Sequence, residues 1–205
     1  MRVLLNDREI SGLDPRLARR IRGRPGDRAV EDVALAAADS IRARGRELML
    51  LLFGTAGLAA FLLCVNVAII ALRAPQATGY AVVACAGAAI LIGALVAVLY
   101  VLMLGAHRRR VEARTSTAQL PAGTTVRVDG SGLTVDGRTT GWAALNVDEL
   151  GVRERQGSES RVTYVERLVL SDGARVIPLD ALFLGSGRAL LRQAWYRLSA
   201  AGADR

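Results

Sequence analysis

Few residues of this 205-residue chain could carry chemistry: it has one histidine, His107, and two cysteines, Cys64 and Cys85. All 27 basic residues are arginines. Without lysine, a Walker A loop, a Schiff base and a Ser-x-x-Lys nucleophile are excluded. Both cysteines lie in apolar runs and are expected to pack as small hydrophobic side chains. A single histidine without a Cys-x-x-Cys motif does not favour zinc or haem, so we expect no metal and no cofactor.

The other polar residues do not combine into a catalytic arrangement. Carboxylates such as Asp148 and Glu149 are scattered along predicted strands and loops, where we expect them to be solvated rather than to form an acid–base pair. Residues 185–187 lie at the start of a predicted helix, and their backbone N–H groups could bind a phosphate, although an N-cap by Ser186 explains the sequence better. We therefore expect no catalytic residue and no enzymatic activity.

The chemistry that the sequence does favour is the binding of anionic groups by arginine. The stretch HRRRVEAR contains four guanidinium groups, at Arg108, Arg109, Arg110 and Arg114. Guanidinium groups form paired hydrogen bonds with phosphate oxygens, and each arginine near an anionic membrane surface contributes ~1 kcal/mol. These four residues are the predicted contact with anionic lipid headgroups.

Two long apolar segments must position these arginines. Between Leu48 and Gly105 the only formal charge is Arg73, whereas the flanks before and after carry net charges of +3 and +4. Each apolar run exceeds the ~20 residues that cross a bilayer as a helix, and a short loop makes them a membrane α-helical hairpin. The sequence predicts these segments in order: an N-terminal arm (1–47), a transmembrane helix (48–72), an external loop (73–78), a second transmembrane helix (79–105), a basic collar (106–114) and a mainly-β domain (115–200).

Arginine placement predicts the orientation of the hairpin. Arg42, Arg44 and Arg46 precede the first span and the collar follows the second, whereas the connecting loop has only Arg73. Because basic flanks stay on the cytoplasmic side, we expect both termini inside and a multi-pass protein of the bacterial cytoplasmic (inner) membrane. The same rule accounts for the collar without any lipid binding, so both interpretations of the collar remain open.

Small residues allow close helix contact in lipid. They recur on both predicted spans: Gly54, Ala56, Gly57 and Ala60 on the first, and Ala89, Gly93 and Ala97 on the second. They indicate packing within the hairpin, which we favour, or a face for a protein partner or a second copy. Asn66 in the first span is expected to make one interhelical hydrogen bond.

The N-terminal arm is predicted to be polar, arginine-rich and helical. Asp14 and Pro15 form a good helix start, residues 23–27 break the pattern, and a second helix runs from about residue 28 into the first span. The arginines of the arm could neutralise nucleic-acid phosphates, but eight acidic residues oppose this, and no nucleic acid is expected. Lipid contact and a solvated arm without a ligand are the alternatives.

The C-terminal region alternates short apolar runs with Asp-Gly turns, a strong signal for β-hairpins. The predicted strands are 124–129, 132–136, 139–144, 146–154, 161–165, 166–171 and 174–179, followed by an amphipathic helix at 186–199. We expect Trp142 and Trp195 to fill the core rather than to stack on a ligand. About seven strands and a closing helix are expected to form a pleckstrin-homology-like (PH-like) domain.

The stretch GLTVDGRTTGWAALNVDELGVRE, followed by ARVIPLDALFL and a terminal amphipathic helix, resembles bacterial YcxB-like membrane proteins. The matching features are the strand from Gly132, Trp142 at the start of the next element, an acidic V-x-E motif, and an Ile-Pro pair before the last helix. The resemblance covers roughly residues 48–200. It implies a two-helix hairpin, a PH-like domain and a membrane location, but no ligand, activity or catalytic residue.

These features predict a non-catalytic interaction module, tethered in the membrane, that presents a PH-like domain at the cytoplasmic face. The expected partners are anionic lipid headgroups, and a protein partner or a second copy bound through the small-residue helix faces. The alternative is an accessory subunit of a larger membrane transport or envelope complex. An interfacial enzyme acting on lipid is the least favoured interpretation.

Overall fold

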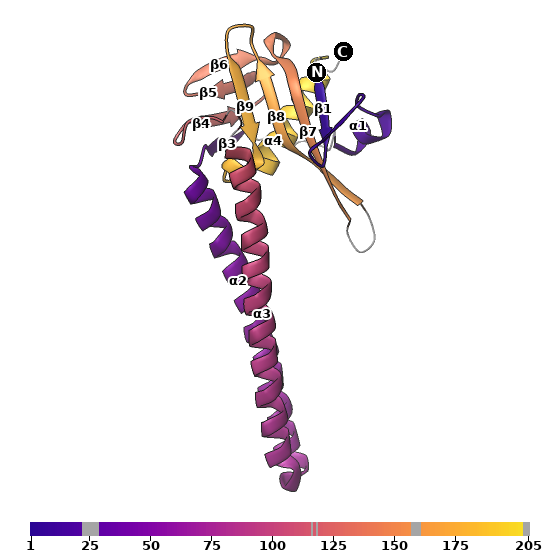
Figure 1. Ribbon diagram of the computed structural model, residues 1–205, viewed down its shortest axis with the longest axis vertical. Helices are drawn as coiled ribbons and strands as arrows, with labels where there is room; N and C mark the ends of the chain where they lie inside the picture. The colour runs from indigo at the N-terminus through magenta and orange to yellow at the C-terminus, as the bar shows by residue number, and fades with distance from the viewer. Residues whose placement is uncertain (22–28, 116, 118, 157–160, 203–205) are drawn as a thin grey trace. The chain divides into compact units, whose positions relative to one another are not determined.

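The computed structural model describes residues 1–21, 29–115, 117, 119–156 and 161–202 (Figure 1). The chain divides into two compact units. Unit 1 contains Met1–Ser40 together with the chain from Arg114 onward, and unit 2 contains Ile41–Ala113. Unit 1 is therefore built from both flanks of the apolar region between Leu48 and Gly105, and unit 2 contains that whole region.

Unit 2 is a pair of long helices. The helices α2 (Ala37–Arg73) and α3 (Thr78–Thr115) are joined through a short 3-10 helix, η1 (Pro75–Ala77). Both are long and apolar enough to cross a membrane, which confirms the predicted helical hairpin at this level. Each helix extends beyond its predicted span because the flanking sequences are rich in alanine, arginine and glutamate, which are strong helix formers.

A seam of less exposed residues marks where the two helices face each other. On α3 these residues recur every three or four positions, which is the spacing of one helix face: Ala81, Cys85, Ala88, Ile92, Val96 and Tyr100. The corresponding series on α2 comprises Leu52, Ala56, Ala59, Leu63 and Val67. A Cβ atom added at Gly45 would lie 3.5 Å from the Tyr100 hydroxyl, so the helices approach closely at this end.

The described residues of unit 1 contain nine strands in two sheets. The strands are β1 (Arg2–Leu5), β2 (Arg8–Ile10), β3 (Val30–Val33), β4 (Thr125–Val128), β5 (Gly132–Val135), β6 (Arg138–Gly141), β7 (Asn146–Gln156), β8 (Arg161–Ser171) and β9 (Val176–Asp180). The five-stranded sheet has the order β2-β1-β7-β8-β9, and the four-stranded sheet has the order β3-β4-β5-β6. Of the pairs among these strands, only β1 with β7 is parallel.

The helical hairpin is inserted between two neighbouring strands of unit 1. Strand β3, which precedes α2, pairs antiparallel with β4, which follows α3, and Val30 lies opposite Val128. Strand β1 pairs with β7, and Val3 lies beside Leu150. Residues on both sides of the hairpin are therefore parts of one hydrogen-bonded fold.

The first 47 residues differ from the predicted helical arm. Helix α1 (Pro15–Ile21) follows the expectation, and the Asp14 carboxylate accepts the Arg16 N–H at its start. The residues before it form the β1–β2 hairpin, and those before α2 form β3, because their alternating apolar side chains pack on the two sheets. The predicted break at 23–27 lies outside the described residues.

The C-terminal strands follow the sequence prediction closely, with two differences. The strand predicted at 139–144 ends at Gly141 and continues as a 3-10 helix, η2 (Trp142–Ala144). The strands predicted at 161–165 and 166–171 are one strand, because β8 pairs with β7 along its length except at Glu166. Helix α4 (Gly187–Ala200) confirms the predicted terminal helix.

The core of unit 1 contains residues of both sheets, α1 and α4. Helix α4 contacts strands of both sheets and buries its predicted apolar stripe, including Trp195. Trp142 also joins this core, and its indole N–H donates to the Asp129 carbonyl oxygen at 3.1 Å. The predicted core positions of both tryptophans are confirmed.

Candidate functional site

The most concentrated group of charges in unit 1 joins five different elements. We call it the arginine–carboxylate network; its members are Asp7, Arg114, Arg153, Glu166 and Asp180. They come from the β1–β2 turn, the last turn of α3, β7, β8 and β9. Two arginines face three carboxylates, so the charges of the network largely cancel.

Arg114 lies at the centre of the network, and its side chain is only 13% exposed. Its Nη1 atom lies 2.8 Å from Asp180 Oδ2 and its Nη2 atom 3.2 Å from Glu166 Oε2, and it also pairs with Asp7. Burial disfavours the charged guanidinium, but the three carboxylates outweigh burial, so the pKa of Arg114 is raised. Arg114 is therefore held as a largely buried cation.

Glu166 is shared between the two arginines of the network. Its Oε2 atom also accepts a hydrogen bond from Arg153 Nε at 2.8 Å, and its side chain is only 7% exposed. Glu166 reaches this position through a β-bulge: Gly151 lies opposite Arg167 and Val152 opposite Val165, so Glu166 has no partner on β7. A bulge redirects the side chain of the extra residue.

Asp180 connects the network to the backbone after β9. Its Oδ1 atom accepts the Leu182 N–H at 2.9 Å and so caps a 3-10 helix, η3 (Ala181–Phe183). Burial raises the pKa of Asp180, while the Leu182 N–H and Arg114 partly oppose this increase. Ser40, in the first turns of α2, donates its hydroxyl hydrogen bond to the Leu182 carbonyl in the same segment.

A second ion pair lies beside the network. Arg167 Nε is 3.1 Å from Glu149 Oε1, and its Nη1 donates to the Thr117 hydroxyl at 2.9 Å. Gly151 lies opposite Arg167, and a Cβ atom there would lie 2.9 Å from Arg167 Cβ. The absence of a side chain at position 151 therefore makes room for Arg167 to lie on β7.

Two of the three N–H groups predicted as a phosphate site before α4 are already engaged by a carboxylate. The Asp32 carboxylate, from β3, accepts the backbone N–H groups of Gly185 and Ser186 at 3.0 and 2.6 Å and the Ser186 hydroxyl at 3.0 Å. Ser186 is the N-cap residue of α4, as predicted, but its side chain makes no capping hydrogen bond. Its hydroxyl is instead held by the Asp32 carboxylate, which is distant in sequence.

The four arginines predicted to contact lipid fall into different environments. Arg109 and Arg110 have exposed side chains, and Arg108, also exposed, donates to Glu112 at 2.8 Å. Arg114 belongs to the buried network described above. The structure thus brings Arg108, Arg109 and Arg110 to one end of unit 2 and places Arg114 in unit 1.

The polar and small residues predicted to join the two helices of the hairpin do not all lie between them. The Asn66 side chain donates to the Leu62 carbonyl of its own helix at 3.0 Å, which replaces the predicted interhelical bond. The residues Ala89, Gly93 and Ala97 are exposed, and a Cβ atom at Gly93 would meet nothing within 4 Å. This stripe therefore lies outside the seam. Cys64 and Cys85 are unbridged, and both line an apolar groove between the helices.

Sequence reasoning missed Asp7 and Asp32 as parts of these clusters. Asn6 and Asp7 have φ angles of 51° and 66°, and Asn-Asp between two alternating apolar runs is a signal for the turn that presents Asp7. No local signal marks Asp32, because its partners are more than 150 residues away.

The clusters of unit 1 link secondary-structure elements by compensated charges. In the part of the chain that the structure describes, no group of three or more His, Cys, Asp and Glu residues could hold a metal ion. Comparison with known proteins finds no family model, no curated protein and no solved structure that matches the chain. A proposal for the function of the chain must therefore rest on the geometry of the two units.

Proposed function

We propose that this chain is a non-catalytic, membrane-anchored interaction module. Its hairpin crosses a bacterial inner membrane twice, and the β domain of unit 1 is presented at the cytoplasmic face, where it binds a partner.

The pairing of strands across the hairpin is the observation that carries this proposal. Residues 2–33 precede α2, and the strands from β4 to β9 follow α3, yet β1 pairs with β7 and β3 pairs with β4. Both flanks must be in the same compartment for this fold to form. Two membrane crossings satisfy that requirement because an even number returns the chain to the side from which it started.

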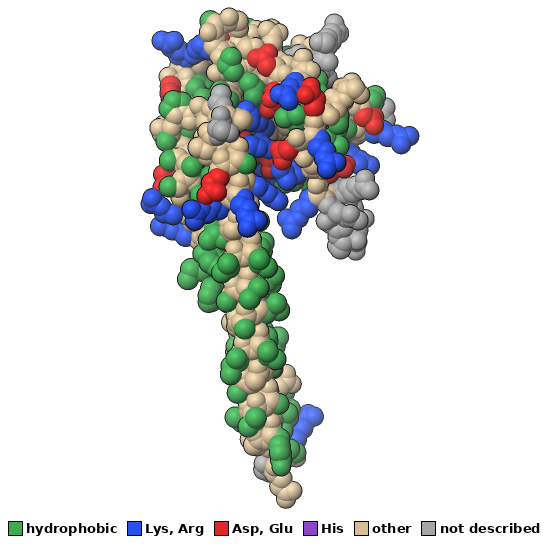
Figure 2. Space-filling view, viewed as in Figure 1, with side chains coloured by type: hydrophobic (Ala, Val, Ile, Leu, Met, Phe, Trp, Pro, Cys, Tyr) green, Lys and Arg blue, Asp and Glu red, His purple; other side chains and the backbone are tan. Residues whose placement is uncertain are grey.

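The surface of the hairpin supports a location in lipid. In the most apolar stretch of α2 only 6% of the residues are buried within the structure, and in that of α3 none is. Figure 2 shows apolar side chains covering this length of the hairpin. Tyr80 and Tyr100 are 20 residues apart, about 30 Å at the helical rise of 1.5 Å per residue, which matches the ~30 Å hydrocarbon core of a bilayer.

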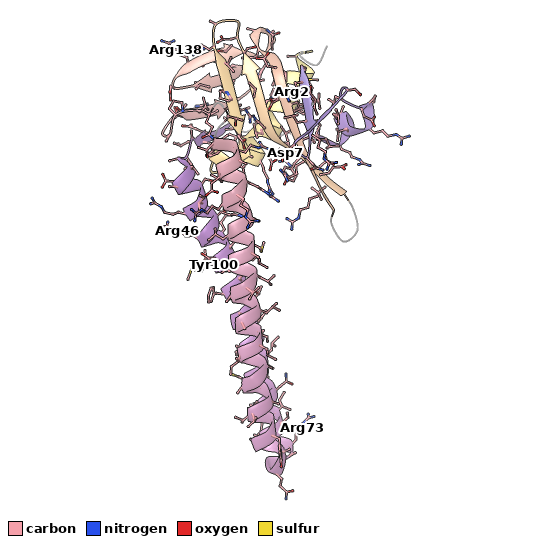
Figure 3. The ribbon with its side chains drawn as sticks, in the orientation of Figure 1. Arg2, Asp7, Arg46, Arg73, Tyr100 and Arg138 are labelled. Atoms are coloured by element: carbon pink, nitrogen blue, oxygen red, sulfur yellow. The ribbon has the colours of Figure 1, made fainter. Side chains whose placement is uncertain are left out.

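The distribution of arginines supports the cytoplasmic orientation. Arg73 lies at the turn of the hairpin, whereas Arg46 lies at the opposite end near Tyr100 (Figure 3). Arg42, Arg44, Arg108, Arg109 and Arg110 belong to that same end. The positive-inside rule assigns the end with six arginines to the cytoplasm.

The type of fold and the YcxB-like resemblance are part of the proposal. Two antiparallel-rich sheets and a C-terminal helix that packs on both are the elements of a PH-like domain. The chain departs from the expected arrangement because β1, β2 and β3 precede the hairpin, so the domain includes the N-terminal segment.

Alkaline carbonate extraction of native membranes, followed by protease treatment of inverted vesicles, tests the proposal. We expect the full chain to stay in the membrane pellet, and protease to reach unit 1 from the cytoplasmic side. Release of the chain into the carbonate supernatant would contradict the anchoring, and protection of unit 1 in inverted vesicles would contradict the orientation.

The outward position of the small-residue stripe favours a second candidate, an accessory subunit of a larger membrane complex. Ala89, Gly93 and Ala97 lie beside the seam and are free to contact another helix. If the chain is such a subunit, Gly93→Leu should disrupt the complex in native-membrane nanoparticles. Gly87→Leu, at another open position of α3, should leave the complex intact. A chain that is monomeric before any substitution would exclude the complex.

A further inference from the structure

We infer that the cytoplasmic end of the hairpin carries a binding site for anionic phospholipid headgroups, formed by Arg46 of α2 and by Arg109 and Arg110 of α3. We call these three residues the open collar. The inference rests on the proposed membrane anchoring and names the ligand of that surface.

Ion pairing divides the arginines at this end of unit 2 into two kinds. Arg44 Nη1 lies 2.6 Å from Glu47 Oε2, and Arg108 Nε lies 2.8 Å from Glu112 Oε1. Arg42 is engaged as well. Among the residues that the structure describes, the three arginines of the open collar are exposed and have no carboxylate partner. Their guanidinium groups keep their hydrogen-bond donors available for a ligand.

The two helices bring the open collar to the same end of the hairpin. Gly45, next to Arg46, lies against Tyr100 and Leu104 of α3, at 3.5 and 3.7 Å from an added Cβ atom. About one and a half to three helical turns then separate these α3 residues from Arg109 and Arg110. Both helices therefore contribute cations to the same end of the hairpin, near a tyrosine of the kind that occurs at membrane interfaces.

The apolar surface that begins beside the open collar identifies the ligand as a lipid. Leu50 and Leu51 are 77% and 62% exposed on α2, and Leu102 is 63% exposed on α3. A phospholipid satisfies both surfaces, because its phosphate accepts guanidinium hydrogen bonds while its acyl chains cover the exposed leucines. A free phosphate would satisfy only the arginines.

Arg114 is not part of this site, although it belongs to the same arginine-rich stretch. Its guanidinium is paired with three carboxylates in unit 1. An anionic headgroup would have to displace these carboxylates and separate a buried ion pair, which is costly.

Paired substitutions of equal charge test the inference in the full chain. The protein is reconstituted in lipid nanoparticles with equal amounts of phosphatidylglycerol and phosphatidylcholine, and retained lipids are counted by native mass spectrometry. We expect the preference for phosphatidylglycerol to fall about fivefold for each arginine removed in Arg109→Gln/Arg110→Gln. The control Arg44→Gln/Arg108→Gln removes the same charge from arginines that are already paired, and we expect a smaller loss.

The outcomes separate the inference from the proposed function. An equal loss in both double variants, or no preference in the unsubstituted protein, would overturn the site. Displacement of phosphatidylglycerol by excess inorganic phosphate would show that free phosphate is the ligand and would also overturn it. A chain that fails to insert, tested by carbonate extraction, refutes the anchoring instead. Unchanged hydrogen exchange in unit 1 excludes misfolding of the variants.

Discussion

The arginines of this chain occupy two contrasting environments. In unit 1, Arg114 and Arg153 are 13% and 17% exposed and bind shared carboxylates. In unit 2, the open collar is exposed and has no carboxylate partner within the described residues. The residue type is the same, and Arg110 and Arg114 are one helical turn apart on α3.

This contrast shows that the surroundings of an arginine decide what it can do. A buried cation must be compensated by neighbouring carboxylates, and the compensated pair then joins the elements that supply it. An exposed cation costs little to leave unpaired, so it contributes little to stability and stays available to a ligand. We therefore expect substitutions in the network to reduce stability and substitutions in the open collar to reduce lipid binding.

The largest expected effect is that of Glu166→Gln. The substitution removes the charge that Arg114 and Arg153 share, and breaking a buried ion pair costs about 3–5 kcal/mol. Chemical denaturation in detergent, followed by tryptophan fluorescence of Trp142 and Trp195, measures the free energy of unfolding of unit 1. The matched control is Arg127→Gln, which breaks an exposed pair with Asp129 and should cost less than about 1 kcal/mol. Equal losses in the two variants would refute the role of burial.

Gly151→Ala has the next largest expected effect. The added Cβ atom would lie 2.9 Å from Arg167 Cβ and 3.5 Å from the Arg167 backbone nitrogen, so β7 and β8 must shift. We expect a loss of about 1–3 kcal/mol in the free energy of unfolding, as for other overpacked sites. Gly130→Ala is the control, because nothing lies within 4 Å of its added Cβ atom. An unchanged midpoint for Gly151→Ala would contradict the close packing of Arg167.

The pKa shifts predict a smaller effect, with opposite signs inside and outside the network. Burial raises the pKa of Asp180. As the pH falls through this raised value toward the unfolded value of about 3.9, folded Asp180 takes up a proton first, and its contribution to stability increases. The hydrogen bond from Ser131 lowers the pKa of Asp129, and that from Arg175 lowers the pKa of Asp172. Their contributions are present above the unfolded value and are lost as the pH falls through the lowered values.

Carboxyl NMR titration of the intact protein in detergent measures these three groups directly. The midpoint of Asp180 should lie above the ordinary value of about 3.9, and those of Asp129 and Asp172 below it. An Asp180 midpoint at or below the ordinary value would show that Arg114 outweighs burial at this position.

The smallest expected effect on stability is that of Arg109→Gln/Arg110→Gln. Because these side chains are exposed and unpaired, the free energy of unfolding of the full chain should change by less than about 0.5 kcal/mol. Thermal unfolding in a zwitterionic detergent measures this change without anionic lipid. A destabilisation as large as that of Glu166→Gln would remove the distinction between the two environments.

Much of the fold is predictable from the sequence because its signals are local. The apolar runs between Leu48 and Gly105 contain one charge, and Asp136-Gly137 lies in a turn with positive φ angles between β5 and β6. Such patterns determine helices and hairpins by themselves. The pairing of β3 with β4 is not predictable in this way, because 91 residues lie between Val33 and Thr125.

The network is less predictable than the open collar for a similar reason. Arg114 has the same local sequence context as Arg109 and Arg110, and only the tertiary fold brings Asp7, Glu166 and Asp180 to it. The Glu166 side chain reaches the network because of a β-bulge, and the alternating sequence pattern of β8 does not reveal where that bulge lies. Sequence reasoning therefore identified a cluster of arginines, but it did not show which of them are paired with carboxylates in the folded protein.

The most direct test of the central claim is the labelling of single cysteines on the two sides of the membrane. In a Cys64→Ala/Cys85→Ala background, Gln76→Cys places a thiol at the turn of the hairpin, and Arg138→Cys places one on the exposed surface of unit 1. The account predicts that a membrane-impermeant maleimide labels position 76 in intact spheroplasts and position 138 only after the cells are opened. Labelling of both positions from the same side would contradict a hairpin that crosses the membrane.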